Sequence, residues 1–234
     1  MMKVGLLECD HVREDLLHIA GDYRQMFPAL FSKVAPGWEF VFYDVCNGHF
    51  PASAEECDVY ICSGSKSSVY DQEEWILQLK QFVKDIYQSE KKYIGVCFGH
   101  QMLGEALGGK VQKSDSGWCV GVHSFQIIKK ENWMQPEQDS LNLLMMCQDQ
   151  VVKLPPESIL LAQSENCPNA MFRVGERMLG IQAHPEFPKI YDKALMELRT
   201  ERIGQAKVDS GIASLEWPTH ETIAAEWIRN FAKV

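Results

Sequence analysis

Short apolar runs alternate with amphipathic segments along the first half of the chain. The apolar runs have the length of buried strands and lie at 3–9, 39–44, 58–62 and 93–96. One helix is predicted over 15–31, a second after Asp71 and Glu74, which have the spacing of a helix start, and a third over 98–107. Strands that alternate with helices are typical of a mainly parallel sheet.

The second half of the chain has a different pattern, with short strands in close succession. These predicted strands lie at 122–128, 143–146, 159–162, 170–174 and 179–182. Two helices follow, at about 190–207 and 220–231, separated by Gly211 and Pro218. We therefore expect one α/β domain over 1–234, three-layered and flavodoxin-like. Its mainly parallel sheet would be completed by a partly antiparallel layer and followed by a helical tail from about 190 to 234.

Composition restricts the classes of partner. The chain of 234 residues is 46% hydrophobic and carries a net charge of −9 with both signs scattered, so the basic surface that nucleic acid requires is not expected. No apolar stretch has the length of a membrane span, and the first residues do not resemble a signal peptide. The eight cysteines show no CxxC spacing, so we expect most to be reduced and buried in a cytosolic protein.

A Gly-x-Cys-x-Gly motif separates the predicted strand at 93–96 from the helix that follows it. A nucleophile at the tip of so sharp a turn has a strained backbone, and its neighbours must be small. Gly95 and Gly99, which have no side chain, meet that need on either side of Cys97. The helix amino end favours a thiolate, and the Phe98 N–H could bind an oxyanion. The motif alone is equally compatible with a buried cysteine whose glycines serve helix–strand packing.

A His-Pro-Glu triplet supplies the general base that a cysteine nucleophile needs. His184 directly follows the predicted strand at 179–182, so it would lie at the same sheet edge as Cys97. Pro185 stiffens the turn, and Glu186 could accept a hydrogen bond from the imidazole and fix its tautomer. The triplet alone is weak evidence, because a loop histidine beside a proline is usually solvated. Together with the elbow it predicts a Cys–His–Glu triad.

The turn Ser63-Gly64-Ser65 follows a third strand, at 58–62. Such a turn can present backbone N–H groups to an anion. A phosphate cradle would need the Gly-Lys-Ser/Thr signature, which is missing here. We therefore expect Gly64 to be the second oxyanion donor beside Phe98, although a plain connecting turn is an equally common role for this sequence.

These motifs resemble those of one enzyme family. The heptapeptide Gly-Val-Cys-Phe-Gly-His-Gln at 95–101, followed by His-Pro-Glu at 184–186, is similar to the class I (triad) glutamine amidotransferases over roughly residues 3–187. Among them the chain resembles the glutaminase domains of the GMP-synthase type. It also resembles free-standing members such as the plant γ-glutamyl peptidases, which share the Gln-Asp-x-Val-x-x-Leu-Pro segment at 148–155.

The resemblance implies a chemistry and a set of roles. Cys97 would attack the γ-carbonyl of a small γ-glutamyl substrate to form a thioester, with His184 as acid and base and Glu186 orienting it. The loop at 146–149 would line the glutamyl pocket together with Gln101. The substrate-binding residues implied in this way are Ser65, Gln101, Met146, Cys147 and Gln148.

Two departures from the family pattern concern the substrate. Lys66 stands where many relatives have proline, and Cys147 stands where many have a histidine. Both leave the predicted triad intact, but they weaken the expectation of a strict preference for free glutamine. Nothing in these residues resembles an ATP-binding synthetase domain that would receive ammonia.

Several functions therefore remain open at this stage. The chain could hydrolyse γ-glutamyl peptides or conjugates, or serve as a glutaminase subunit for a separate synthetase. Less favoured are a non-catalytic binding protein of the same fold and a cysteine peptidase or redox chaperone, whose relatives usually lack His-Pro-Glu.

We expect no cofactor and no metal, because His11 and His18 lack the carboxylates of a coordination sphere and are better explained as a solvated helix face. The helical tail could also form a homo-oligomer or partner surface.

Overall fold

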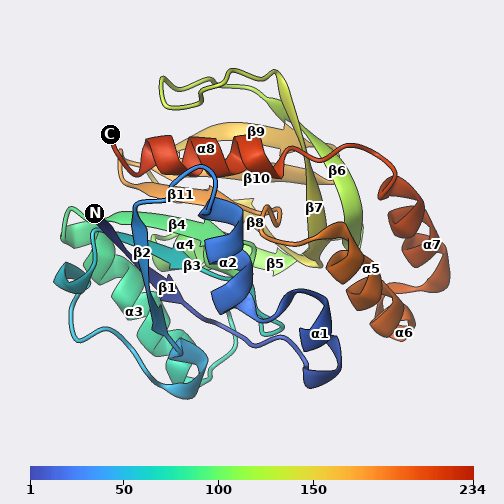
Figure 1. Ribbon diagram of the computed structural model, residues 1–234, viewed down its shortest axis with the longest axis horizontal. Helices are drawn as coiled ribbons and strands as arrows, with labels where there is room; N and C mark the ends of the chain where they lie inside the picture. The colour runs from blue at the N-terminus through green and yellow to red at the C-terminus, as the bar shows by residue number, and fades with distance from the viewer.

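A nine-stranded sheet runs through the centre of the computed structural model, which describes all residues from 1 to 234 (Figure 1). Its strand order is β2-β1-β3-β4-β11-β10-β9-β6-β7. The first five of these strands are parallel, in the order typical of flavodoxin-like folds, and the remaining four are antiparallel. The predicted α/β class and the partly antiparallel layer are therefore confirmed.

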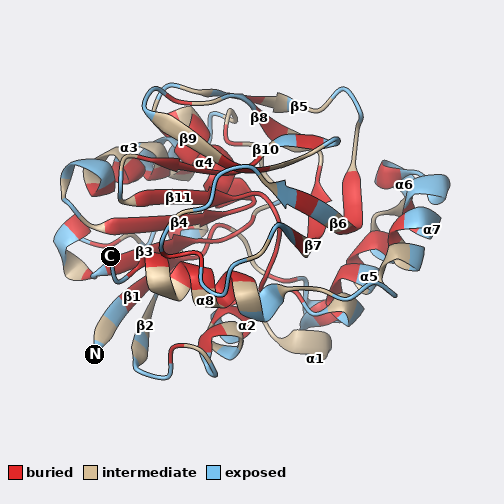
Figure 2. Cartoon of the chain, turned by 90° about the horizontal axis from the view of Figure 1, so that it is seen from above, coloured by how far each residue is buried: buried red, intermediate tan, exposed pale blue.

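The strands lie close to the predicted runs. Those of the large sheet are β1 (Met2–Leu7), β2 (Trp38–Tyr43), β3 (Val59–Cys62), β4 (Lys92–Val96), β6 (Cys119–Ile127), β7 (Ser140–Cys147), β9 (Ser158–Ser164), β10 (Cys167–Val174) and β11 (Met178–Ile181). Strands β3, β4 and β11 are buried throughout, which explains why they appear in the sequence as continuous apolar runs (Figure 2).

A second, two-stranded sheet was not predicted. It pairs β5 (Lys110–Lys113) with β8 (Asp149–Lys153) in antiparallel fashion. Only Gln148 lies between the end of β7 and the start of β8, so the expected loop at 146–149 is mostly strand. Val151 of β8 packs against the helix that follows Cys97, because a Cβ added at Gly104 would lie only 2.9 Å from its Cγ2. This small sheet closes one side of the site.

Helices cover both faces of the large sheet. Helices α3 (Glu74–Gln88) and α4 (Phe98–Ala106) pack on one face, whereas α2 (Tyr23–Phe31) and α8 (Glu221–Phe231) lie together on the other. Helix α3 begins three residues later than Asp71, whose carboxylate instead accepts a hydrogen bond from the Ser68 N–H. The C-terminal helix α8 thus lies beside α2 from the first half of the chain, and in Figure 1 it passes in front of β9 and β10.

The single helix predicted over 15–31 is wrong. A short 3₁₀ turn (Glu14–Leu16) leads into α1 (Leu17–Ala20), and α2 starts separately. Gly21 has φ +75°, which ends α1, and the Asp22 carboxylate forms a capping box with Gln25 that starts α2. The apolar residues over 15–31 have helical spacing throughout, but the glycine and the capping residue after it decide where one helix ends and the next begins.

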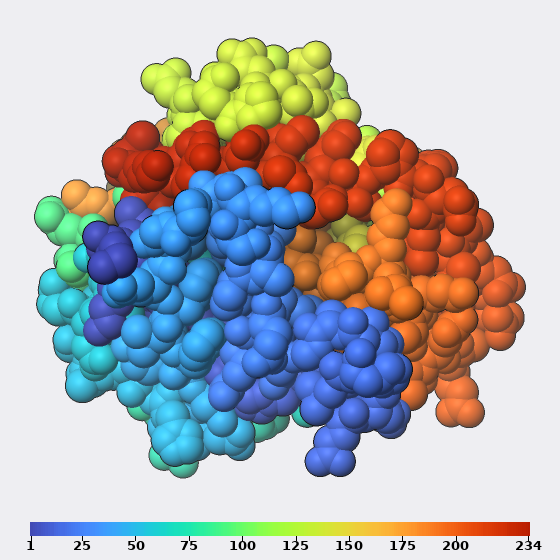
Figure 3. All heavy atoms as spheres, in the orientation of Figure 1, coloured from blue at the N-terminus to red at the C-terminus, as the bar shows by residue number.

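Of the two predicted tail helices, the one at 220–231 corresponds to α8, whereas the single helix at about 190–207 is wrong. The tail consists of α5 (Lys189–Leu198), α6 (Thr200–Ile203), α7 (Gln205–Ser214) and α8. The break occurs at Gly204, with φ +94°, whereas Gly211 lies inside α7 and packs closely on Gly121 of β6. Figure 3 shows the tail passing from the α5–α7 side of the molecule across to the N-terminal half, beneath the β6–β7 hairpin.

Two further 3₁₀ turns, Val45–Asn47 and Ala54–Glu56, connect strands of the parallel half. All eight cysteines are free, and all but Cys46 are buried. None of the helices has both the length and the apolar character that a membrane crossing requires.

Candidate active site

Cys97 stands at the strained turn that the sequence predicts between β4 and α4. Its φ of +51° is rare for a residue with a side chain, and its own N–H donates to the Ile181 carbonyl of β11 at 2.9 Å. A Cβ at Gly95 would lie 2.3 Å from the carbonyl carbon of Gly99, and one at Gly99 would lie 2.4 Å from the Cys62 oxygen. Both glycines are therefore required for the turn to form.

His184 lies beside this turn, at the carboxyl end of β11. Its N–H donates to the Leu144 carbonyl of β7 at 2.8 Å, which fixes the segment across the sheet. Nδ1 of the imidazole lies 2.8 Å from Oε1 of Glu186, and both side chains are buried. The ring of Phe187 stacks on the imidazole at 3.9 Å between centroids, nearly in parallel. The imidazole is thus held in one orientation from two sides.

The charge state of His184 follows from these neighbours. Burial alone lowers the pKa of a histidine, but here the negative charges of Glu186 and Cys97 outweigh it and raise the pKa of His184 to about 10. The imidazole is therefore protonated at neutral pH and pairs with the Glu186 carboxylate.

The turn after β3 lies against the cysteine and the histidine. A Cβ at Gly64 would stand 2.9 Å from Cε1 of His184 and 3.8 Å from Cβ of Cys97. The buried Ser63 hydroxyl accepts from the Cys9 N–H and donates to the Gly64 carbonyl, so the turn is fixed. The Gly64 N–H donates no hydrogen bond within the chain. Phe98 begins α4, so its N–H has no partner in its own helix.

A cavity of about 130 Å³ opens in front of Cys97. Its lining includes all five residues that the family resemblance implied for substrate binding: Ser65, Gln101, Met146, Cys147 and Gln148. The amide nitrogen of Gln101 donates to the Asp149 carbonyl at 2.7 Å, so this side chain also fastens β8 to α4. Cys147 is fully buried, and burial raises the pKa of its thiol well above the ordinary range, so it stays a neutral thiol.

Other residues of the cavity were missed by the sequence analysis. They are Ser67, Ser68, Lys113, Trp118, Arg199 and Arg202. They belong to the loop after β3, the small sheet, the segment before β6 and the junction of α5 and α6. No motif links these segments, and only the fold brings them to one place. Asp149 and Lys66 also line the cavity, and the sequence singles out both, Asp149 as part of the loop at 146–149 and Lys66 as a departure from the family pattern.

His100, next to Cys97 on α4, does not face the cavity. It is fully buried against Phe172, with ring centroids 4.8 Å apart, and burial lowers its pKa to about 3. It is therefore a neutral packing residue. Its Nδ1 would lie 2.7 Å from a Cβ at Gly180, so the histidine requires a glycine on β11.

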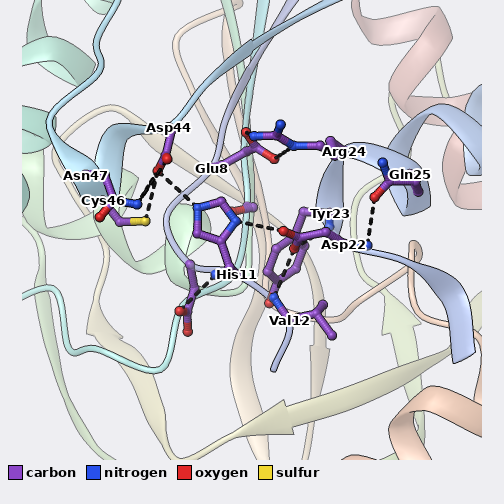
Figure 4. Close-up of polar contacts among 12 residues, drawn as sticks. Glu8, His11, Val12, Asp22, Tyr23, Arg24, Gln25, Asp44, Cys46 and Asn47 are labelled. Carbon is purple, nitrogen blue, oxygen red and sulfur yellow. Dashed lines mark hydrogen bonds and ion pairs between the residues drawn. The ribbon is translucent and has the colours of Figure 1, made fainter. Parts of the chain in front are cut away.

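His11 lies in the loop after β1, and two carboxylates from other segments hold its ring (Figure 4). Nδ1 lies 2.7 Å from Oδ2 of Asp22, and Nε2 lies 3.1 Å from Oδ1 of Asp44. Ligand atoms of His11, Asp44 and Cys46 lie within 4.8 Å of one another, but both ring nitrogens are already paired. The expected helix face shared with His18 is wrong, because His11 precedes the helix and only His18 belongs to α1.

The comparisons with known proteins agree with this geometry. The sequence model of the class-I glutamine amidotransferases matches residues 45–199. The chain belongs to this family. It is 28% identical over 227 residues to γ-glutamyl peptidase 3 of Arabidopsis thaliana, a match that covers 91% of this chain and 89% of the peptidase.

Two further comparisons concern a longer relative and the fold. The chain is 32% identical over 127 residues to a GMP synthase of Porphyromonas gingivalis, covering 54% of this chain but only 24% of the synthase. The structure matches that of a glutamine amidotransferase from Thermotoga maritima with a TM-score of 0.79 at 19% identity. That match covers 100% of this chain and 99% of the other, and it supports the fold alone.

Proposed function

We propose that this protein hydrolyses a γ-glutamyl amide through a γ-glutamyl thioester on Cys97. The observation that carries the proposal is the convergence of the His184–Glu186 pair and the Gly64 turn on Cys97, which itself lines the cavity. A nucleophile, an oriented base and free backbone N–H groups are the parts that acyl transfer needs. Family membership supports the same chemistry.

The first half of the reaction forms the thioester. The Cys97 thiolate attacks the γ-carbonyl carbon, and the oxygen of the tetrahedral intermediate takes up the negative charge. The N–H groups of Gly64 and Phe98 are the donors proposed for this oxygen. The carbon–nitrogen bond then breaks, and the amine leaves with the proton that His184 gives it.

The second half releases glutamate. His184, now neutral, takes a proton from water, which attacks the thioester carbonyl. The carbon–sulfur bond breaks, the γ-carboxylic acid is freed and gives its remaining proton to solvent or to the released amine, and the thiolate and imidazolium are restored. Glu186 keeps Nδ1 of His184 paired in both halves, so Nε2 is the nitrogen that exchanges the proton.

Two functions are compatible with this chemistry, and they differ in the γ-glutamyl donor. Hydrolysis of γ-glutamyl peptides or conjugates is favoured by the Arabidopsis relative, because a protein named for that activity matches along nearly its whole length. The alternative is a glutaminase subunit that passes ammonia to a separate synthetase. It is supported by the GMP synthase match, in which this chain covers only about a quarter of the larger protein.

A substrate screen tests the proposal. Glutamate release would be measured from glutamine, glutathione, glutathione conjugates and γ-glutamyl polyamines, with Cys97→Ala as the blank. Release from a γ-glutamyl peptide by the isolated protein supports the hydrolase. Glutamine turnover that is low alone and rises when a synthetase is added supports the subunit. No Cys97-dependent release from any donor, by folded protein, contradicts both.

A non-catalytic role would be recognised by a different result. A binding or regulatory protein of this fold would retain γ-glutamyl ligands without release of glutamate. Equilibrium binding of glutathione without any thioester or product would favour that reading.

A further inference from the structure

Three cations line the catalytic cavity without any partner in the chain. Lys113, Arg199 and Arg202 all contribute to its wall, yet none of their side chains forms an ion pair or a hydrogen bond. Single lysines and arginines without an ion pair, such as Lys33 and Lys84, also occur elsewhere on the surface, so the significant feature is the gathering of three at one cavity. Unpaired cations gathered at one cavity indicate a negatively charged ligand.

The backbone that carries each of these residues belongs to or adjoins a regular element. Arg199 lies at the junction of α5 and α6, and Arg202 of α6 lies over the Trp118 ring, 5.5 Å from its centroid. The Trp118 segment is in turn tied to α7, because the Lys207 ammonium donates to the Trp118 carbonyl at 3.0 Å. Lys113 is the last residue of β5. The three cations therefore reach the cavity from fixed backbone positions.

The charges of the remaining lining residues do not balance the three cations. Lys66 is already paired with Asp10, at 2.9 Å. Asp149 is the only carboxylate of the lining, and its Oδ2 accepts a hydrogen bond from the Ser68 hydroxyl at 2.5 Å. The glutamyl end of any donor brings one ammonium and one carboxylate. One carboxylate cannot match three cations, so the other end of the substrate is expected to be anionic too.

We propose that Lys113, Arg199 and Arg202 form a subsite for a carboxylate on the leaving amine. This inference rests on the proposed function and narrows its substrate class. The preferred donors are γ-glutamyl amino acids or peptides with a free carboxyl end, over glutamine and over γ-glutamyl conjugates of neutral amines. Arginine suits the role because its planar guanidinium can bind a carboxylate with two parallel hydrogen bonds.

The test compares γ-glutamylalanine with γ-glutamylalanine amide, which differ only in the charge of the leaving group. Arg199→Gln and Arg202→Gln remove one charge each, and Lys193→Gln is the matched control, because Lys193 lies on α5 outside the cavity and pairs with Glu197. An exposed ion pair is worth up to about fivefold in affinity. Each arginine variant should therefore lose about fivefold in kcat/KM on the carboxylate substrate and remain near wild type on the amide.

Binding to Cys97→Ala protein, measured by calorimetry, separates this inference from the proposed function. The inactive protein should bind γ-glutamylalanine about tenfold or more tightly than its amide, and the arginine changes should erase the difference. Equal binding of the two ligands overturns the subsite, whether or not the wild-type protein turns them over. Equal losses on both substrates would also overturn it, because the arginines would then serve the glutamyl end or the fold. Preferential binding without turnover would contradict only the proposed function.

Discussion

The imidazole of His184 lies directly against the backbone of Gly64, where a single methyl group would stand 2.9 Å from Cε1. No other heavy atom lies as close to that point, since Tyr23 Oη and Cys97 Cβ are 3.6 and 3.8 Å away. The glycine at this turn is therefore required by the histidine. Its φ is not in the left-handed region, so an alanine there would disturb the site and leave the backbone relaxed.

Gly64→Ala is expected to lower kcat/KM by about 100-fold or more, because a displacement of the imidazole by a fraction of an ångström spoils its alignment with the cysteine. The melting temperature should change little. The measurement is glutamate release together with thermal unfolding, and Gly37→Ala is the control, since a Cβ there meets nothing within 4 Å. Wild-type activity in Gly64→Ala would show that His184 is not constrained at this turn.

Glu186→Gln removes the charge that does most to raise the pKa of His184. The pKa of His184 should fall from about 10, so a smaller fraction of the imidazole is positively charged at neutral pH. We expect iodoacetamide to alkylate Cys97 more slowly at neutral pH in the variant than in wild type, because less positive charge then lies beside the sulfur. Turnover should fall by roughly 10²- to 10⁴-fold.

The control for this change is Glu197→Gln, an exposed carboxylate on α5. An alkylation profile of Glu186→Gln that matches wild type would mean that Glu186 does not set the charge of His184.

His11 is predicted to make stability depend on pH. Burial alone lowers its pKa, but hydrogen bonds to Asp22 and Asp44 outweigh that effect and raise it above 6.5. The charged pairing is present in full below the unfolded-state pKa and is lost as pH rises through the higher folded-state value. The pairing is partly exposed, so His11→Asn should cost about 1 kcal/mol at pH 6 and less at pH 9.

Urea unfolding at the two pH values measures this difference. His18→Asn is the control, since that histidine is exposed on α1. A cost for His11→Asn that grows with pH would contradict the assigned pairing.

Asp192 should make the folded state less stable as pH rises, which is the opposite of the effect of a carboxylate that forms an ion pair. Burial raises its pKa to about 7, against the opposing charges of His184 and Arg199. The folded state therefore keeps a proton that the unfolded chain releases near pH 4, and stability falls as pH rises from about 4 to 7. Asp192→Asn should be more stable than wild type by roughly 2–4 kcal/mol at pH 8 and about equal to it at pH 4.

Denaturant unfolding of Asp192→Asn across this range is the measurement, with the exposed Asp209→Asn on α7 as control. A loss of stability at pH 8 would mean that the ionised Asp192 carboxylate is stabilised in the fold.

The parts of the fold that local sequence determines were predictable. The buried strands at β3, β4 and β11 and the elbow at Cys97 depend on neighbours in the chain, so their patterns are visible. Strands β5 and β8 are short and half exposed, and they pair with each other and pack on Gly104 of α4 through Val151, contacts between residues far apart in the chain. The break before α2 did carry a local signal, in Gly21, Asp22 and Gln25, that the apolar spacing concealed.

The residues of the candidate site also fall into a group that could be predicted from the sequence and a group that could not. Cys97, His184 and Glu186 stand in motifs whose residues lie close together in the chain. Arg199 and Arg202 follow no motif, because their position at the cavity depends on how α5 and α6 pack beside the Trp118 segment. The chemistry could therefore be predicted from the sequence, whereas the side of the cavity that would select the substrate could not.

The most direct test of the central claim is to detect the thioester itself. Wild-type protein mixed with glutathione or γ-glutamylalanine would be quenched in acid within milliseconds and analysed by peptide mass spectrometry. We predict a mass increase of one glutamyl group on the peptide that contains Cys97, removed by hydroxylamine and missing in Cys97→Ala. Glutamate release with no glutamyl group on Cys97, or with one on another of the eight cysteines, would contradict the account.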